Sequence, residues 1–182
     1  RKYSTLGLLK WYDLSGDKKA LKSACRLIDY TMGQIGPDKA HIFNCGNYKG
    51  MAPSSILEPV MFLYRRTMNK KYLDFAKFIV TDWEKEGGPQ LIAKADEPVG
   101  QRFPVKGFSQ WWTRDNGQKA YEMMSCYVGL LELYKVTHQQ NYLQTVENVV
   151  RHIMSEEINI CGSGAAFECW YGGNQRQTRP AY

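Results

Sequence analysis

Three stretches of the chain repeat one pattern of hydrophobic and polar positions. Residues 8–30, 60–82 and 130–152 align without gaps when one tyrosine of each is superposed. In each stretch apolar residues recur three and four positions apart, stop at a short polar turn, and then recur again. This spacing is typical of one face of a helix. Each stretch therefore predicts a helix, a short turn such as Gly16-Asp17 or Met68-Asn69, and a second helix.

The segments between these hairpins are too long for a compact repeat protein. The aligned tyrosines lie 52 and 70 residues apart, and residues 33–54, 84–117 and 155–182 hold much of the Gly and Pro. A helical hairpin cannot bury its apolar face alone, so repeated hairpins must pack on one another. Long connections at one rim favour a helical toroid over a solenoid, and long structured loops are usually functional. We therefore expect an all-α fold built from helical hairpins.

Composition and charge narrow the classes of function. Of the 182 residues, 43% are hydrophobic and 23% are charged, which is typical of a globular domain. The longest apolar runs are shorter than the roughly 20 residues that a membrane helix needs, and we expect no membrane span. The net charge of +6 is scattered along the chain, so we expect no nucleic-acid partner. Five irregularly spaced cysteines and three histidines without ligand spacing predict no metal site in these residues.

Aromatic side chains gather in the long connections. Trp111 and Trp112 lie in the second connection, and Trp170 lies in the third. Aromatic rings bind the apolar faces of sugars as readily as they pack in cores. Both interpretations stay open for Trp111 and Trp112, whereas the small-residue loop before Trp170 favours a ligand site.

Several blocks of sequence, in a fixed order, resemble a known enzyme family. They are RKYSTLGLLKWYDLSGDKKAL, GMAPSSILEPVMFLYRRTMNKKYLDFAKFIV, KAYEMMSCYVGLLELYKVT and GSGAAFECWYGGNQRQTRPAY. Together they resemble the β-L-arabinofuranosidase family, glycoside hydrolase family 127 and its relatives. The resemblance implies a six-hairpin glycosidase with an (α/α)6 toroid, acting as a retaining, exo-acting hydrolase of terminal arabinofuranose. Because the chain opens on Arg1, we expect residues 1–182 to be a single domain cut from a larger (α/α)6 catalytic domain.

The resemblance also implies one catalytic carboxylate. Many members carry Gly-Glu-Ala-Phe in their Gly-rich loop, and this glutamate is their acid/base group. Here the loop reads Gly164-Ala165-Ala166-Phe167, and the carboxylate follows at Glu168. Members then hold zinc with a glutamate and cysteines, one of which is the nucleophile, in a segment with no counterpart before Tyr182. We therefore expect no cofactor in residues 1–182, zinc in the full-length protein, and no activity of these residues alone.

The neighbours of Glu168 suit an acid on physical grounds as well. Glycoside hydrolysis generally needs one group to protonate the leaving oxygen and another to attack or to activate water. Apolar neighbours raise the pKa of a carboxyl if the loop packs down, so Glu168 is our candidate acid. A solvated loop glutamate without a function is the alternative.

Two further glutamates and two lysines complete the predicted sugar-binding rim. Glu58 and Glu122 each lie near the start of a helix, and we expect these helix starts to share one rim. Their structural explanations are a capping box with the preceding serines for Glu58 and a first-turn contact with Lys119 for Glu122. By resemblance, Lys2 and Lys119 stand where some members have histidines at the sugar. A lysine donates hydrogen bonds to hydroxyls and also suits an anionic sugar.

The sequence thus predicts a glycosidase of the β-L-arabinofuranosidase type, which acts on the terminal sugar of a glycan. A non-catalytic carbohydrate-binding or scaffold protein is an alternative, and so is another (α/α)6 enzyme, either an epimerase or a polysaccharide lyase. An incomplete toroid would leave an apolar flank uncovered, through which two copies would pair as a dimer.

Overall fold

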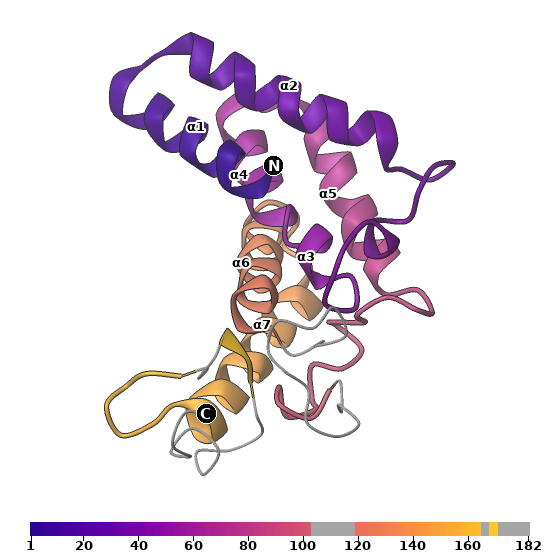
Figure 1. The fold of residues 1–182 in the computed structure, drawn as a ribbon, viewed down its shortest axis with the longest axis vertical. Helices are drawn as coiled ribbons and strands as arrows, with labels where there is room; N and C mark the ends of the chain where they lie inside the picture. The colour runs from indigo at the N-terminus through magenta and orange to yellow at the C-terminus, as the bar shows by residue number, and fades with distance from the viewer. Residues whose placement is uncertain (103–118, 165–167, 171–182) are drawn as a thin grey trace.

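The computed structural model describes residues 1–102, 119–164 and 168–170, which form helices joined by irregular segments (Figure 1). The helices are α1 (Lys2–Ser15), α2 (Lys18–Gln34), η1 (Ile42–Asn44), α3 (Met51–Ser54), α4 (Leu57–Thr67), α5 (Lys70–Trp83), α6 (Ala120–Thr137), α7 (Gln140–His152) and the π-helical turn η2 (Ile153–Glu157). In this part of the chain extended pairing is limited to two isolated bridges, Ile35 with Ala40 and Lys119 with Cys169. The all-α fold class is confirmed.

The three predicted hairpins are confirmed, and each turns in the same way. Helix α1 packs on α2, α4 on α5, and α6 on α7. The residue that ends each first helix is left-handed: Gly16, Met68 and His138 have φ of 69°, 51° and 55°. Its amide donates to the carbonyl of the aligned tyrosine four residues back, which closes the helix end. The sequence repeat is therefore a repeat of helix-turn-helix geometry.

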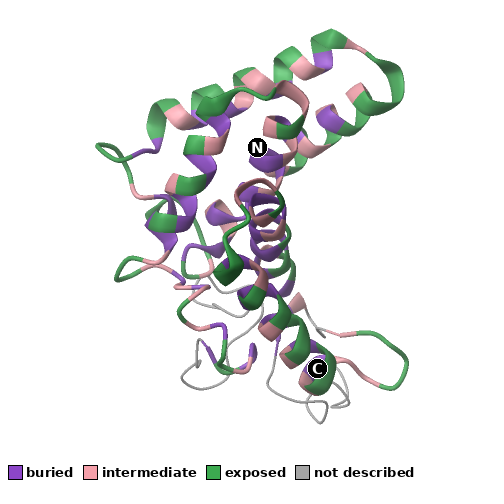
Figure 2. Cartoon of the chain, turned by 180° about the vertical axis from the view of Figure 1, so that it is seen from behind, coloured by how far each residue is buried: buried purple, intermediate pink, exposed green. Residues whose placement is uncertain are grey.

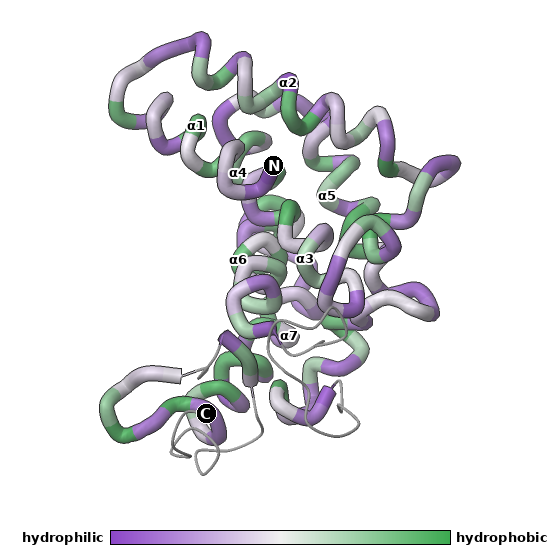
Figure 3. The backbone as a smooth tube through the Cα atoms, viewed as in Figure 1, coloured by the Kyte–Doolittle hydropathy of each residue, from purple (hydrophilic) through white to green (hydrophobic). Residues whose placement is uncertain are grey.

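The outer helices, which are the second helices α2, α5 and α7 of the hairpins, bury one face each. Hydrophobic and hydrophilic residues alternate along α2, and the buried residues lie between the helices (Figures 2 and 3). Ile28 and Val80, which align in the repeat, are buried in α2 and α5. Val150 aligns with them but is 46% exposed, because no described element covers that side of α7.

The inner helices α1, α4 and α6 lie in a row, since α4 contacts both of the others. Helix α6 also contacts α3, α5 and α7, which explains why its buried residues lie on most of its sides. Its approach to α4 depends on Gly129: a Cβ atom there would lie 2.7 Å from the backbone nitrogen of Glu58 and 2.8 Å from the carbonyl carbon of Leu57. Only a residue without a side chain permits this contact.

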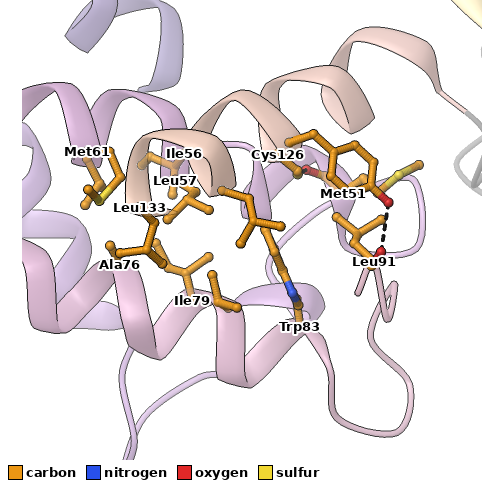
Figure 4. Packing of buried hydrophobic residues seen from close by; sticks show 14 of the residues in the cluster. Met51, Ile56, Leu57, Met61, Ala76, Ile79, Trp83, Leu91, Cys126 and Leu133 are labelled. Atoms are coloured by element: carbon orange, nitrogen blue, oxygen red, sulfur yellow. Dashed lines mark hydrogen bonds between the residues drawn. The ribbon is translucent and has the colours of Figure 1, made fainter. Parts of the chain in front are cut away.

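The hydrophobic core lies where α4, α5 and α6 meet (Figure 4). Leu57, Met61, Ile79, Trp83 and Leu133 are fully buried there. Burying a side chain of this size stabilises the fold by about 1.5–3 kcal/mol. This core fixes the inner helices relative to one another and so positions their N-terminal ends.

A buried carboxylate ties the first long connection to α5. The side chain of Asp82 is fully buried and accepts hydrogen bonds from the amide of Ile42 and from Nδ1 of His41, both at 2.7 Å. Nζ of Lys85 lies 2.9 Å from the same carboxylate. Burial by itself raises the pKa of Asp82, but the hydrogen bonds outweigh it and hold the pKa below its usual value. The ionised Asp82 therefore anchors η1.

Apolar side chains are exposed at both ends of the row of hairpins. Trp11 and Leu14 of α1 are 56% and 84% exposed, and Met124 and Val128 of α6 are each 38% exposed. Dimerisation through such a flank stays a prediction. Within the described residues, no helix combines the length and the hydrophobicity needed to cross a bilayer.

Candidate functional site

The N-terminal ends of the inner helices bring charged side chains from distant parts of the chain to one place. Lys2 begins α1, Glu58 lies in the first turn of α4, and Glu122 lies in the first turn of α6. The charges of Glu58 and Glu122 both act on Lys2 and Tyr3, so the three helix ends share one electrostatic environment. The rim cluster, as we call it, consists of Lys2, Glu58, Lys119, Glu122 and Glu168.

Glu168 reaches this cluster through a backbone pairing. Lys119, the residue before α6, forms an antiparallel bridge with Cys169. Glu168 itself has φ of 62°, a left-handed conformation that is uncommon for a residue other than glycine. Strained backbone of this kind clusters at functional sites, where the surrounding structure enforces it.

The N-cap residue of α6, Lys119, and a residue of its first turn, Tyr121, hold the carboxylate of Glu168. Nζ of Lys119 donates to Oε2, and the hydroxyl of Tyr121 donates to Oε1 at 2.6 Å. The hydrogen bond from Lys119, and to a smaller extent that from Tyr121, holds the pKa of Glu168 below its usual value. The bond to Glu168 in turn raises the pKa of Tyr121 to about 12. The expectation that an apolar setting raises the pKa of Glu168 is therefore wrong, because an ammonium and a phenol donate hydrogen bonds to its charged form.

Lys119 lies between aromatic rings. Its Nζ atom is 5.2 Å from the ring centre of Tyr48 and 5.3 Å from that of Tyr121, and its side chain is only 4% exposed. Burial tends to lower the pKa of Lys119, but the bond to Glu168 outweighs it and raises the pKa. The ammonium of Lys119 is thus a fixed positive charge beside the carboxylate of Glu168.

A tight loop brings Tyr48 to Lys119. Tyr48, Lys49 and Gly50 are left-handed in succession, with φ of 59°, 54° and 85°. A Cβ on Gly50 would lie 2.6 Å from the Cα of Phe43, so only glycine fits there. Because Phe43 belongs to η1, the anchor at Asp82 also supports the position of Tyr48.

Glu122 lies in the opposite environment to Glu168. Its Oε2 atom is buried and has no hydrogen-bond partner among the described residues. Burial raises the pKa of Glu122, and the hydrogen bond from its own backbone amide together with the attraction of Lys119 and Lys2 only partly offsets this. The structural explanation of Glu122 was a contact with Lys119, but the ammonium of Lys119 forms an ion pair with Glu168.

Glu58 is fixed by a contact between helices rather than by a capping box. Helix α4 begins at Leu57 after Ile56, which makes no side-chain cap, and the hydroxyl of Ser55 donates to the carbonyl of Ala52 at 2.7 Å. The predicted capping box is therefore wrong. The buried hydroxyl of Ser125 on α6 donates to Oε2 of Glu58 across the contact at Gly129.

Of the three tryptophans named as candidates, the structure describes Trp170. Trp170 is only 5% exposed, and its ring belongs to the hydrophobic core. Room for the ring exists because residue 164 is glycine: a Cβ there would lie 3.1 Å from the ring atom Cζ3. A role of Trp170 at a ligand site stays a prediction, and Trp111 and Trp112 lie outside the described residues.

Sequence reasoning misses two residues of this site, Tyr121 and Ser125. Both lie within the block KAYEMMSCY, at the start of a predicted helix. Their partners, Glu168 and Glu58, are 47 and 67 residues away, and no local spacing indicates such pairs.

A metal site does not form in the described part of the chain. In residues 1–102, 119–164 and 168–170, no three side chains of His, Cys, Asp or Glu gather closely enough to hold an ion. The zinc ligands that the resemblance implies are thus not found among these residues. Zinc binding by the full-length protein stays a prediction, and no step that we assign to the rim cluster depends on a metal.

Comparison with known proteins identifies the class of protein. A protein-family model described as β-L-arabinofuranosidase, GH127 catalytic domain, matches residues 3–179 of the chain. Together with the all-α hairpin fold, this match defines a glycoside hydrolase domain of the helical toroid type, whose substrate is a carbohydrate. The chain belongs to the GH127 β-L-arabinofuranosidase family. A search of curated proteins found no match.

Proposed function

We propose that this chain supplies the sugar-binding rim of a retaining, exo-acting hydrolase of the β-L-arabinofuranosidase type. The observation that supports this most directly is the convergence of Glu58, Glu122 and Glu168 at the N-terminal ends of inner helices from different hairpins. Partly buried carboxylates in one place cost free energy, and such groups concentrate at functional sites. Glycoside hydrolysis is a reaction that uses carboxylates in this way.

The charges of the rim cluster suit a neutral sugar. Lys119 is already paired with Glu168, and Lys2 lies in the field of Glu58 and Glu122. Neither lysine therefore offers an uncompensated positive charge to a uronic acid, which a polysaccharide lyase of this fold would bind. Lys2 retains donors for sugar hydroxyls, and Glu58 is an acceptor whose position Ser125 fixes.

Glu168 is our candidate catalytic carboxylate. Its side chain is 40% exposed, so a substrate can reach it, and its hydrogen bonds keep it ionised near neutral pH. An ionised carboxylate stabilises the positive charge that develops on the sugar ring in the transition state. The same ion pair also suits a protein that only binds sugars, which is why turnover must be measured.

Hydrolysis of aryl arabinofuranosides by the natural protein containing this chain tests the proposal. We expect release from the 4-nitrophenyl β-L-arabinofuranoside and not from the α-L-furanoside or the β-L-pyranoside, with a product of retained configuration by NMR. Glu168→Gln should lower kcat by at least about 100-fold, a typical size for removal of a catalytic proton-transfer or charged group.

Glu147→Gln, an exposed position on α7, is the matched control and should leave kcat unchanged. Release from none of the arabinosides would refute the proposed activity, and sugar binding without cleavage would favour a carbohydrate-binding protein. Wild-type turnover by Glu168→Gln would refute the role of Glu168. The same assay on residues 1–182 alone tests the expectation that they are inactive.

A further inference from the structure

Two exposed tyrosine rings lie beside the rim cluster. Tyr121 in the first turn of α6 is 42% exposed, and Tyr3 at the start of α1 is 64% exposed. The charge of Glu168 acts on the hydroxyls of both tyrosines, and Tyr3 in turn acts on Tyr121. The two rings therefore come from different hairpins but share the surroundings of the candidate catalytic carboxylate.

The hydroxyl of Tyr121 fixes its ring next to the reacting bond of a substrate. This hydroxyl lies 2.6 Å from Oε1 of Glu168. In a bound substrate the glycosidic oxygen must also approach a catalytic carboxylate to hydrogen-bond distance, about 2.6–3.2 Å. The ring of Tyr121 and the sugars joined by that oxygen thus extend from the same carboxylate. A bound sugar therefore comes within reach of the Tyr121 ring.

Differences in burial indicate which sugar the tyrosines contact. The side chain of Lys119 is 4% exposed, and both Ser125 and Oε2 of Glu122 are buried. Such buried polar groups suit the hydroxyls of an enclosed terminal sugar. An exo-acting hydrolase encloses that sugar alone, so the rest of the glycan extends toward solvent. Tyr3 and Tyr121 are the aromatic side chains exposed on that side of the cluster.

Both rings are oriented before any sugar binds. Nζ of Lys2 lies 4.8 Å from the ring centre of Tyr3, and Nζ of Lys119 lies 5.3 Å from that of Tyr121. An ammonium is attracted to the face of an aromatic ring and so favours one orientation of that ring. Tyrosine offers a large amphipathic surface at a low cost in conformational entropy, and aromatic rings pack on the apolar faces of sugars.

We propose that Tyr3 and Tyr121 form the subsite for the second sugar of the substrate, the one on the leaving-group side of the scissile bond. Their rings contact the apolar face of this sugar, while the rim cluster binds the terminal sugar. This inference rests on the proposed hydrolase function and deepens it, because it identifies which part of the glycan beyond the terminal sugar the chain recognises. It also separates the two groups of Tyr121: the hydroxyl holds Glu168, and the ring binds the sugar.

Two substrates test the subsite in the natural protein containing this chain. One is a disaccharide in which β-L-arabinofuranose is linked to a second arabinofuranose, and the other is methyl β-L-arabinofuranoside, which has no second sugar. Aryl glycosides are avoided because their ring would itself stack on the tyrosines. The quantity measured is the ratio of kcat/KM for the disaccharide to kcat/KM for the methyl glycoside. Effects of a variant on the reaction itself cancel in this ratio.

We expect Tyr121→Leu to lower the ratio by about five- to tenfold, the size of one lost aromatic contact. Tyr121→Phe keeps the ring and loses the hydroxyl, so it should lower kcat/KM on both substrates by the same factor and preserve the ratio. Tyr3→Leu should lower the ratio by at least about threefold. Trp11→Leu is the matched control, because Trp11 is 56% exposed and lies about two turns further along α1. It should leave the ratio at the wild-type value.

Equal ratios for Tyr121→Leu and Tyr121→Phe would overturn the inference, because the ring would then make no contact with the second sugar. A wild-type ratio in Tyr3→Leu would overturn it as well. Should Tyr121→Leu fail to fold, Tyr3→Leu carries the test by itself, since it changes a side chain that is 64% exposed. Cleavage of neither substrate by the wild type would overturn the proposed function, whereas cleavage of both with unchanged ratios in the variants would overturn the subsite alone.

Discussion

Replacing Gly129 with alanine tests how closely α4 and α6 must approach. Gly129 lies in α6, where a Cβ atom would meet the backbone of α4 at 2.7 Å from the nitrogen of Glu58. The side chain of Leu57 lies at the same distance. Backbone atoms cannot rotate away as a flexible side chain can, so the helices must separate by several tenths of an ångström.

The cost follows from two opposing effects. Overpacking a tight contact costs about 1–3 kcal/mol, and backbone contact places this site near the upper end of that range. Alanine in the middle of a helix recovers about 1 kcal/mol relative to glycine. We therefore expect Gly129→Ala to lower the free energy of unfolding by about 2 kcal/mol, and the melting temperature of a domain of this size by about 4–8 °C.

Gly7→Ala is the matched control, because Gly7 also lies within a helix but has nothing within 4 Å of its would-be Cβ. It should stabilise the protein by about 0.5–1 kcal/mol. Urea unfolding followed by circular dichroism measures both variants. If Gly129→Ala were as stable as the wild type, the close approach of α4 and α6 at the Glu58–Ser125 contact would be wrong.

Three further predictions concern the supports of the rim cluster. Asp82→Asn should lower the free energy of unfolding, measured by urea titration, by about 2 kcal/mol at neutral pH. Because the pKa of Asp82 is depressed in the folded state, the difference from the wild type should vanish as the pH falls through that depressed pKa. Lys119→Gln should raise the pKa of Glu168 and so move the acid limb of kcat/KM to higher pH. Gly50→Ala should cost at least about 2 kcal/mol in a melting experiment, because φ is 85° and the backbone of Phe43 leaves no room.

Each of these predictions has an outcome that contradicts it. A constant difference between Asp82→Asn and the wild type from pH 7 to pH 2 would show that Asp82 carries no depressed pKa. If the acid limb of kcat/KM did not move in Lys119→Gln, the ionisation of Glu168 would not control that limb. Wild-type stability of Gly50→Ala would contradict the packing of residue 50 on η1.

The hairpins were predictable from the sequence because helix formation depends on neighbours three and four residues apart. Gly16, Met68 and His138 end the first helices, and the three repeats align them at one equivalent position. Charged residues near helix starts were predictable for the same reason. The match of residues 3–179 to a family of hydrolases agrees with the interpretation of the sequence blocks.

The chemistry of the site was much less accessible to sequence reasoning. The apolar neighbours of Glu168 predict a raised pKa, yet Lys119 and Tyr121, 49 and 47 residues away, lower it. Serines before Glu58 predict a cap, yet its partner is Ser125 on another helix. No local pattern indicates that the ring of Trp170 packs into the core, as it does.

The sequence by itself therefore determined the helical hairpins, their turns and the family to which the chain belongs, because local spacing and the order of blocks carry this information. Only the tertiary structure decided which carboxyl is buried and which is paired. Those properties depend on the packing of α1, α4 and α6, since pKa values respond to burial and to charges a few ångströms away, however distant in the chain. The contrast between Glu122 and Glu168 is a product of that packing.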